Sequence, residues 1–191
     1  MSKESIDPKS SEPEPSVEYP AAPEGDNDRL ADEKGWAVDD LDPAASDFVA
    51  DICESLPDSA ADSTSRPQWL AESGNMDGDG KAVLRAGIPK LCLKWTPVMK
   101  QAVSGKYDRW FGDGTYVVSS KPAADEDEET IPPGMYRARG RMKDCYWERA
   151  TESGDIIDDR LATSAQEVTV TIRASDGQFT SERCAVRKPV R

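Results

Sequence analysis

The four cysteines are the residues whose type and spacing most restrict the chemistry of this chain. The interval between Cys53 and Cys92 equals the interval between Cys145 and Cys184. Four cysteines can pair in three ways, and the pairing 53–92 with 145–184 closes one loop in each half of the folded chain. Closing a loop of about 40 residues stabilises a fold by roughly 4 kcal/mol on the chain-entropy account. Four buried free thiols are the alternative, and a zinc site is disfavoured because the chain has no histidine and no CxxC pair.

Three arginines are the candidate binding residues. Arg137, Arg139 and Arg141 alternate in the sequence, so they point to one side if residues 135–142 form a single strand. Three guanidinium groups on one face can bind carboxylates or phosphates of an anionic cell-surface or virion component, or of the chain's own acidic N-terminal tail. The alternative is a solvated face on which the arginines pair with acids of the adjacent strand, such as Glu148.

A weak calcium candidate lies within residues 43–105, the stretch predicted below to be helical. In the stretch NMDGDG, Asn75, Asp77 and Asp79 occupy the first positions of a calcium-binding loop. Position twelve of that loop is Ala86, so the bidentate carboxylate is missing. We expect no metal site beyond this candidate.

The composition argues against several classes of function. Without histidine, Ser-His and Cys-His catalytic dyads are excluded, and no pair of carboxylates is marked for acid–base chemistry. We therefore predict that the protein is not an enzyme and uses no cofactor, with a carboxylate-based enzyme as the alternative. The net charge of −13 is concentrated in residues 1–80, whereas residues 81–191 are weakly basic. Such a distribution argues against nucleic acid as a partner, because phosphate binding needs a basic surface.

The elements that position these residues follow from the local patterns. Residues 1–42 are rich in Pro, Glu, Asp and Ser, and we expect them to be disordered because they bury little apolar surface. In residues 43–105, apolar residues recur at three- and four-residue spacing, which predicts short helices. Pro57 should end the first helix, and later breaks should precede Pro89 and Pro97.

From Gly112 onward the period becomes two, which is typical of strands. The predicted strands are GTYVV (114–118), MYRARGRM (135–142), CYWERAT (145–151), EVTVTIR (167–173) and QFTSER (178–183), with CAVRK as a further partner. The acidic stretch 123–129 should be a solvated loop. The sequence therefore predicts an α+β fold with a disordered acidic tail (1–42), a small disulfide-stapled helical unit (43–105) and a small antiparallel β-sandwich or barrel (106–191).

The strand-rich half resembles a known module. The motifs WFGDGTYVV, IPPGMY, CYWER and SDGQFTSERC occur in an order similar to that of the C-terminal β module of small exported proteins and lipoproteins of actinobacteria, also found in actinobacteriophages. The resemblance covers about residues 106–190. It implies an oxidising compartment and a β fold but no assigned activity. After Cys184, the glycine and aromatic residue expected from the resemblance are replaced by Ala185 and Val186.

The expected location is extracytoplasmic. Paired cysteines need an oxidising environment, yet the first residues, MSKESIDPKS, contain no apolar stretch of a secretory signal. The sequence then represents a mature form, has a different start, or reaches its compartment by another route, as a virion component does. No apolar run is long enough for a transmembrane segment. We predict a non-enzymatic extracytoplasmic or virion-associated binding module; the alternative is an intracellular phage or mobile-element effector whose acidic tail mimics nucleic acid.

Overall fold

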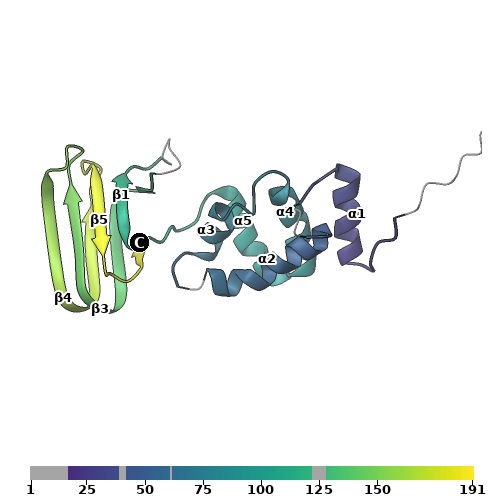
Figure 1. Ribbon diagram of the computed structural model, residues 1–191, viewed down its shortest axis with the longest axis horizontal. Helices are drawn as coiled ribbons and strands as arrows, with labels where there is room; N and C mark the ends of the chain where they lie inside the picture. The colour runs from purple at the N-terminus through teal and green to yellow at the C-terminus, as the bar shows by residue number, and fades with distance from the viewer. Residues whose placement is uncertain (1–16, 39–41, 61, 122–127) are drawn as a thin grey trace, which may run out of the picture.

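The computed structural model describes residues 17–38, 42–60, 62–121 and 128–191. Helices gather on one side of the molecule and strands on the other, with residues 105–113 running between them (Figure 1). The helical elements are α1 (Glu24–Lys34), α2 (Ala45–Ser59), α3 (Arg66–Glu72), α4 (Gly80–Leu91), the 3-10 turn η1 (Leu93–Trp95) and α5 (Thr96–Ser104). The strands are β1 (Gly114–Val118), β2 (Thr130–Ile131), β3 (Gly134–Ala150), β4 (Ile156–Ile172), β5 (Gln178–Glu182) and β6 (Arg187–Pro189). An α+β fold is confirmed.

The helices enclose a hydrophobic cluster of their own. In α2, Phe48, Val49, Ile52 and Leu56 are buried at the spacing of one helical face, as the sequence predicts. Side chains from α4 and α5 close the other side of the cluster, among them Val83, Leu84, Ile88, Met99 and Ala102. Gly105 ends α5 with a positive φ of 66°, a conformation that glycine adopts without steric cost.

Two helix ends differ from the prediction. α2 continues through Pro57 to Ser59, and α4 continues through Pro89 to Leu91. Both prolines lie in the last turn of their helix, where little helix remains to be disrupted. The break after α4 falls at Cys92, whose extended φ of −144° stops the helix.

Part of the predicted disordered tail is helical, so that prediction is wrong for α1. Asn27 and Asp28 of α1 are buried, and Ala31 belongs to the helical cluster. The Asp28 carboxylate accepts hydrogen bonds from Ser46 N at 2.7 Å and Ser46 Oγ at 3.0 Å, at the start of α2. A carboxylate is stabilised at a helix N-terminus, and acidic composition alone cannot reveal such a contact. Residues 1–16 and 39–41 of the predicted tail lie outside the described residues.

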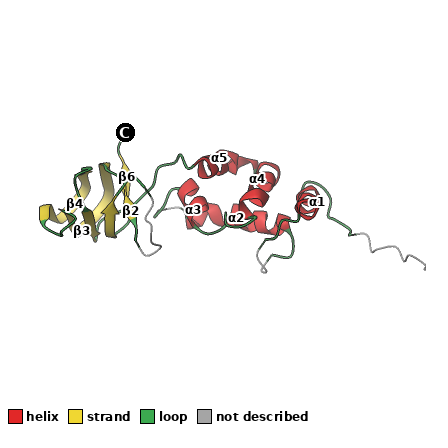
Figure 2. Ribbon diagram, turned by 90° about the horizontal axis from the view of Figure 1, so that it is seen from above, coloured by secondary structure: helices red, strands yellow, loops and turns green. Residues whose placement is uncertain are grey.

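The strands form one mixed six-stranded sheet in the order β2-β1-β5-β3-β4, with β6 beside the first half of β3 (Figure 2). The predicted sandwich or barrel is wrong, because the described strands lie in a single sheet whose edges do not close. β3 and β4 form a long antiparallel hairpin, and β5 and β6 follow one another along the opposite edge of β3. β1 and β2 pair in parallel, so the sheet is not purely antiparallel.

The stretches predicted as two separate strands, 135–142 and 145–151, are joined in β3. The strand continues across residues 143 and 144 without a turn. It contains a register shift between Arg139 and Met142, and Asp144 has a positive φ of 54°. The irregularity reverses the alternation: Tyr136 and Ala138 face the core before it, and Cys145 and Trp147 after it. The first eleven residues of β4 were not predicted as strand, because they lack an alternating apolar pattern. The predicted loop at 123–129 lies mostly outside the described residues.

Both disulfides have the expected connectivity. Cys53 in α2 bonds to Cys92 directly after α4, and Cys145 in β3 bonds to Cys184 after β5. Each bond stays with one hydrophobic cluster, since Cys53 and Cys92 pack on the helices and Cys145 and Cys184 on the sheet. Among the described residues, no helix is both long and apolar enough to cross a bilayer.

Candidate anion-binding site

Three basic residues lie close together on the face of the sheet opposite its core. Tyr136 and Ala138 of β3 point into the core, so Arg137 and Arg139 between them point outward. On the neighbouring strand β6, Lys188 is the register partner of Arg137. Directly paired residues of antiparallel strands share a face, and like charges in such a pair are destabilising. Three cations therefore lie together at an energetic cost.

One internal carboxylate faces these cations. Glu167 of β4 is the register partner of Arg139 and accepts a hydrogen bond of 2.8 Å from Arg139 Nε. Arg137 Nε lies 3.5 Å from the other oxygen of Glu167 but is buried without a hydrogen bond of good geometry. The hydrogen bond from Arg139, supported by the charge of Arg137, lowers the pKa of the Glu167 carboxyl below its usual value. One carboxylate thus satisfies Arg139 and leaves Arg137 with unused donor capacity.

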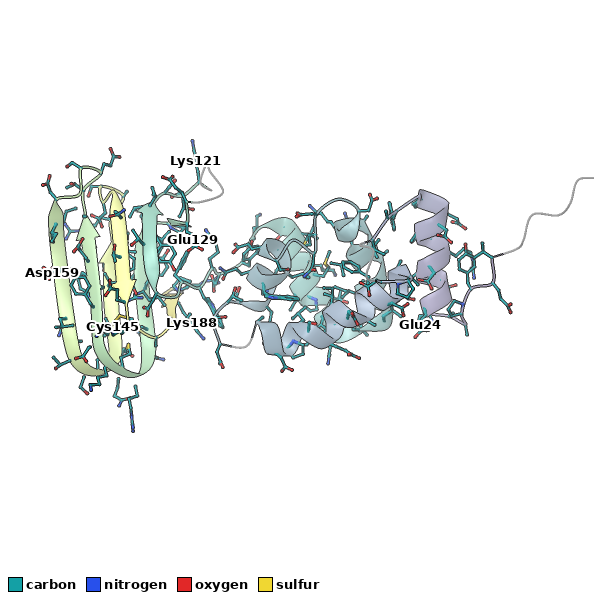
Figure 3. All side chains as sticks on the ribbon, viewed as in Figure 1. Glu24, Lys121, Glu129, Cys145, Asp159 and Lys188 are labelled. Carbon is teal, nitrogen blue, oxygen red and sulfur yellow. A yellow bond between two sulfur atoms is a disulfide. The ribbon has the colours of Figure 1, made fainter. Side chains whose placement is uncertain are left out.

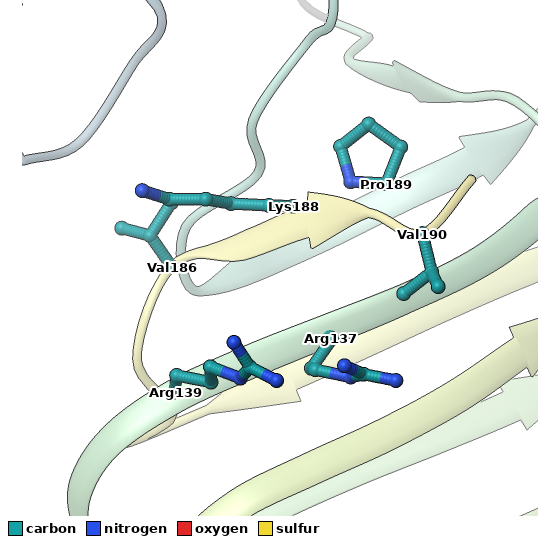
Figure 4. Close-up of a pocket in the computed structure, with 6 residues that line it drawn as sticks. All are labelled: Arg137, Arg139, Val186, Lys188, Pro189 and Val190. Carbon is teal, nitrogen blue, oxygen red and sulfur yellow. The ribbon is translucent and has the colours of Figure 1, made fainter.

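A pocket of about 410 Å³ opens between the arginines and the C-terminal strand. Arg137 and Arg139 form one wall, and the residues around β6 form the other (Figure 4). The lining is completed by Val186, Lys188, Pro189 and Val190. A pocket with cationic groups on an apolar frame suits a ligand that carries an anionic group on a less polar body.

Lys188 is held in place by an aromatic ring. Its Nζ lies 3.5 Å from the centroid of the Trp110 ring, which is a close cation–π contact. Trp110 belongs to the segment that leads from the helices into the sheet, and Lys188 lies where that segment meets the sheet (Figure 3). The backbone of Trp110 is fixed in turn by the amide of Gln68 in α3: Trp110 N donates to Gln68 Oε1 at 2.7 Å, and Gln68 Nε2 donates to Trp110 O at 3.2 Å.

A buried arginine that the sequence did not single out lies on β6 next to the pocket residue Lys188. Arg187, next to Lys188, is only 1% exposed and donates to Ser181 Oγ, which itself donates to Asp113 Oδ1 at 2.9 Å. Asp113 also accepts from Cys184 N at 3.0 Å. Burial lowers the pKa of Arg187 to about 10. The alternation in CAVRK places residues 187 and 188 on opposite faces, and this was the signal available in the sequence.

The third predicted arginine is not part of the site. Arg141 follows the register shift in β3 and does not line the pocket. The predicted pairing partner Glu148 is also wrong, because it lies on β3 itself and accepts a hydrogen bond from Tyr146 OH. The acid that pairs with the arginines is Glu167 of β4. The sequence predicted this part of β4 as a strand but not which residues of β3 it faces.

The calcium candidates are used in other ways. Asp79 Oδ2 accepts a hydrogen bond from Ala37 N at 3.1 Å, and Asn75 Nδ2 donates to Ser73 Oγ at 2.7 Å. The Asp79 contact ties Ala37 to the segment before α4, and the Asn75 contact lies within the loop itself. No group of three or more potential metal-binding acids or cysteines, Asp77 included, occurs in the described part of the chain.

Comparison with known proteins gives one match. Residues 108–186 match the family described as "Rv1352-like extracellular domain". The match includes Arg137, Arg139 and the Cys145–Cys184 disulfide, and it excludes all the helices and Lys188. No curated protein and no solved structure matches the chain. The family match and the two disulfides fit an extracytoplasmic module.

Proposed function

We propose that this chain, whose strand-rich half is similar to an extracellular domain, is a non-enzymatic extracytoplasmic module that binds an anionic surface component through Arg137, Arg139 and Lys188. The observation that carries the proposal is that Arg137 and Arg139 both lie within ion-pair distance of one carboxylate, Glu167, while only Arg139 is hydrogen-bonded to it. Guanidinium groups bind carboxylates and phosphates through several directed donors, and here two of them already converge on such a group.

The charge balance of the pocket favours an external anion. Arg137, Arg139 and Lys188 bring three positive charges to the pocket, and Glu167 offsets one of them. Glu167 does not line the pocket and its side chain is 47% exposed, so a polymer carboxylate or phosphate can compete with it for the same guanidinium groups or bind beside it. The pairing of Arg137 with Lys188 opposes two positive charges and so does not stabilise the fold, which favours a role in binding an anion.

The test is binding to two soluble probes, poly-glutamate for carboxylates and linear polyphosphate for phosphates. The full chain should bind at least one of them, with an affinity that falls as salt rises because exposed charges are screened. The variant with Arg137→Gln, Arg139→Gln and Lys188→Gln should lose that binding. Its fold should survive, as shown by its circular dichroism and melting.

The matched control removes the same number of charges from exposed basic residues that do not line the pocket, through Lys121→Gln, Arg141→Gln and Lys143→Gln. It should keep most of the binding. Equal loss in both triple variants would mean that only net charge matters, and the proposed site would be wrong. Binding that survives in the pocket variant would contradict the proposal equally.

The same proposal places the protein at the surface of an actinobacterium or on the virion of one of its phages. Its support is the motif resemblance of the strand-rich half and the fit of two disulfides to an oxidising compartment. Fractionation of the source cells or purified virions, followed by mass spectrometry without reduction, tests this. A reduced protein found in the cytoplasm would refute it.

A further inference from the structure

The long strand β4 has one edge that no strand of the described residues covers. Among the described residues, β4 pairs only with β3, and it ends the strand order of the sheet. The opposite end of that order is the two-residue strand β2, which offers almost no edge. A seventeen-residue edge presents a row of unpaired backbone donors and acceptors, which is a template for another strand.

The first part of this edge is also apolar and exposed. Residues 156–161 are all exposed, and the relative exposures of Ile156 and Leu161 are 60% and 59%. Ile157 is exposed to 42%. Large apolar side chains on an unprotected edge are the features that soluble proteins usually avoid. The charged residues Asp158, Asp159 and Arg160 lie between them.

We propose that β4 pairs with β4 of a second copy of this chain, antiparallel and with Asp159 at the two-fold axis. In an antiparallel pair, two directly opposed residues either both point their backbone N–H and C=O groups at the partner strand or both point them away from it. These directions alternate along a strand, so two opposed residues from identical strands differ in number by zero or an even number. A residue must therefore lie opposite its own copy at the axis. The partner is identified by the sequence of β4 itself, and the proposal involves none of the residues of the anion-binding site.

Charge complementarity selects the position of the axis. With Asp159 at the axis, Asp158 lies opposite Arg160 of the second copy, and Ile157 lies opposite Leu161 of the second copy. Symmetry makes each of these pairs twice. An axis at Arg160 or at Asp158 would also oppose two like charges, but it would form no Asp158–Arg160 pair to offset them. An axis at Leu161 would leave Arg160 opposite an alanine.

The proposed register has one unfavourable contact, because the two Asp159 side chains face each other. Like charges directly opposite are destabilising. Asp159→Ser should therefore strengthen association, which a mere surface position would not do. The effect should shrink as added salt screens the two carboxylates.

Sedimentation equilibrium of the full chain is the first test. The wild-type chain should associate to a dimer in a concentration-dependent way. Arg160→Asp opposes two carboxylates and should weaken the dimer at least tenfold, as should Asp158→Arg, which opposes two guanidinium groups. The double variant with Asp158→Arg and Arg160→Asp should recover the dimer. Since Asp158 also lies 3.5 Å from Arg149, the melting of each variant is compared first.

Cross-linking tests the register without relying on charge. Under mild oxidation, Asp159→Cys should give a covalent dimer, whereas Leu161→Cys should give none because the two copies of residue 161 are displaced by four residues. A wild-type chain that stays monomeric at the highest soluble concentration would overturn the proposal. So would failure of the charge exchange to recover the dimer, or cross-linking of Leu161→Cys in place of Asp159→Cys.

Discussion

Arg149 and Asp176 form a buried, bidentate ion pair. Arg149 Nε donates to Asp176 Oδ2 at 2.7 Å, and Arg149 Nη2 donates to Asp176 Oδ1 at 2.9 Å. Asp176 Oδ2 also accepts from Arg173 N at 2.8 Å. The pair thus fixes the turn between β4 and β5 against the end of β3. Two charges buried with matched hydrogen bonds are sensitive to the loss of either partner.

Asp176→Asn should destabilise the sheet by about 3–5 kcal/mol, because it removes the buried counter-charge of the Arg149 guanidinium and leaves only the more exposed Asp158, 3.5 Å away. Denaturant unfolding followed by circular dichroism measures the change. Glu182→Gln on the exposed side of β5 is the matched control and should have little effect. An equal loss of stability in both variants would contradict a special role for the buried pair.

The same pair predicts a loss of stability in acid. The hydrogen bonds from Arg149 lower the pKa of Asp176 below its usual value. A carboxyl whose folded pKa is depressed stabilises the fold above its unfolded pKa of about 3.9, and this contribution is lost as the pH falls through the folded pKa. Between about pH 6 and about pH 2, the wild-type free energy of unfolding should therefore fall further than that of Asp176→Asn. Parallel curves would show that this carboxyl does not contribute.

Replacing Glu167 by glutamine should strengthen binding of the anionic probe. The substitution removes the carboxylate that occupies Arg139 and lies near Arg137, and it raises the net positive charge of the pocket. We expect an increase of several-fold at low salt that disappears at high salt. Glu129→Gln, on the other side of the sheet order, is the control and should not change affinity. Weaker binding by Glu167→Gln would mean that Glu167 positions the arginines.

Each disulfide should stabilise the hydrophobic cluster in which it lies. Joint replacement of Cys145 and Cys184 by serine should destabilise the sheet by about 2–5 kcal/mol. Joint replacement of Cys53 and Cys92 should lower the stability of the helices and leave that of the sheet largely unchanged. Hydrogen exchange reports the two regions separately. Equal loss of protection in helices and sheet from either pair of substitutions would show that they unfold as one unit.

The contact between Gln68 and Trp110 should hold the connecting segment to the helices. Gln68→Ala leaves the backbone N–H and C=O of the half-buried Trp110 without two hydrogen bonds and should cost about 1–3 kcal/mol locally. The expected result is faster exchange of the Trp110 amide and faster proteolysis near residues 106–112. Gln101→Ala, an exposed glutamine of α5, should alter neither. Unchanged exchange at Trp110 in Gln68→Ala would refute this role.

The sequence by itself determined the secondary-structure class of each half, and it favoured the observed pairing of the cysteines over the other connectivities and over free thiols. Three- and four-residue spacing in α2 and two-residue spacing in β1, β5 and the second half of β4 depend on local sequence alone, so these elements were predictable. The equal spacing of Cys53–Cys92 and Cys145–Cys184 limited the connectivity in the same way. Arg137 and Arg139 were also identified from alternation within one strand.

Only the tertiary structure decided which residues meet those arginines. A register shift after Arg139 removes Arg141 from the group, and a shift of register depends on the pairing of β3 with β4 rather than on the pattern within either strand. The same pairing brings Glu167 to the arginines, and the β3–β6 pairing brings Lys188. Asp28 shows the same limit in the helices. The acidic composition around Asp28 predicted disorder. Its carboxylate is instead buried against Ser46, eighteen residues further along the chain. Composition and periodicity report local preferences, whereas such contacts form only when distant segments pack together.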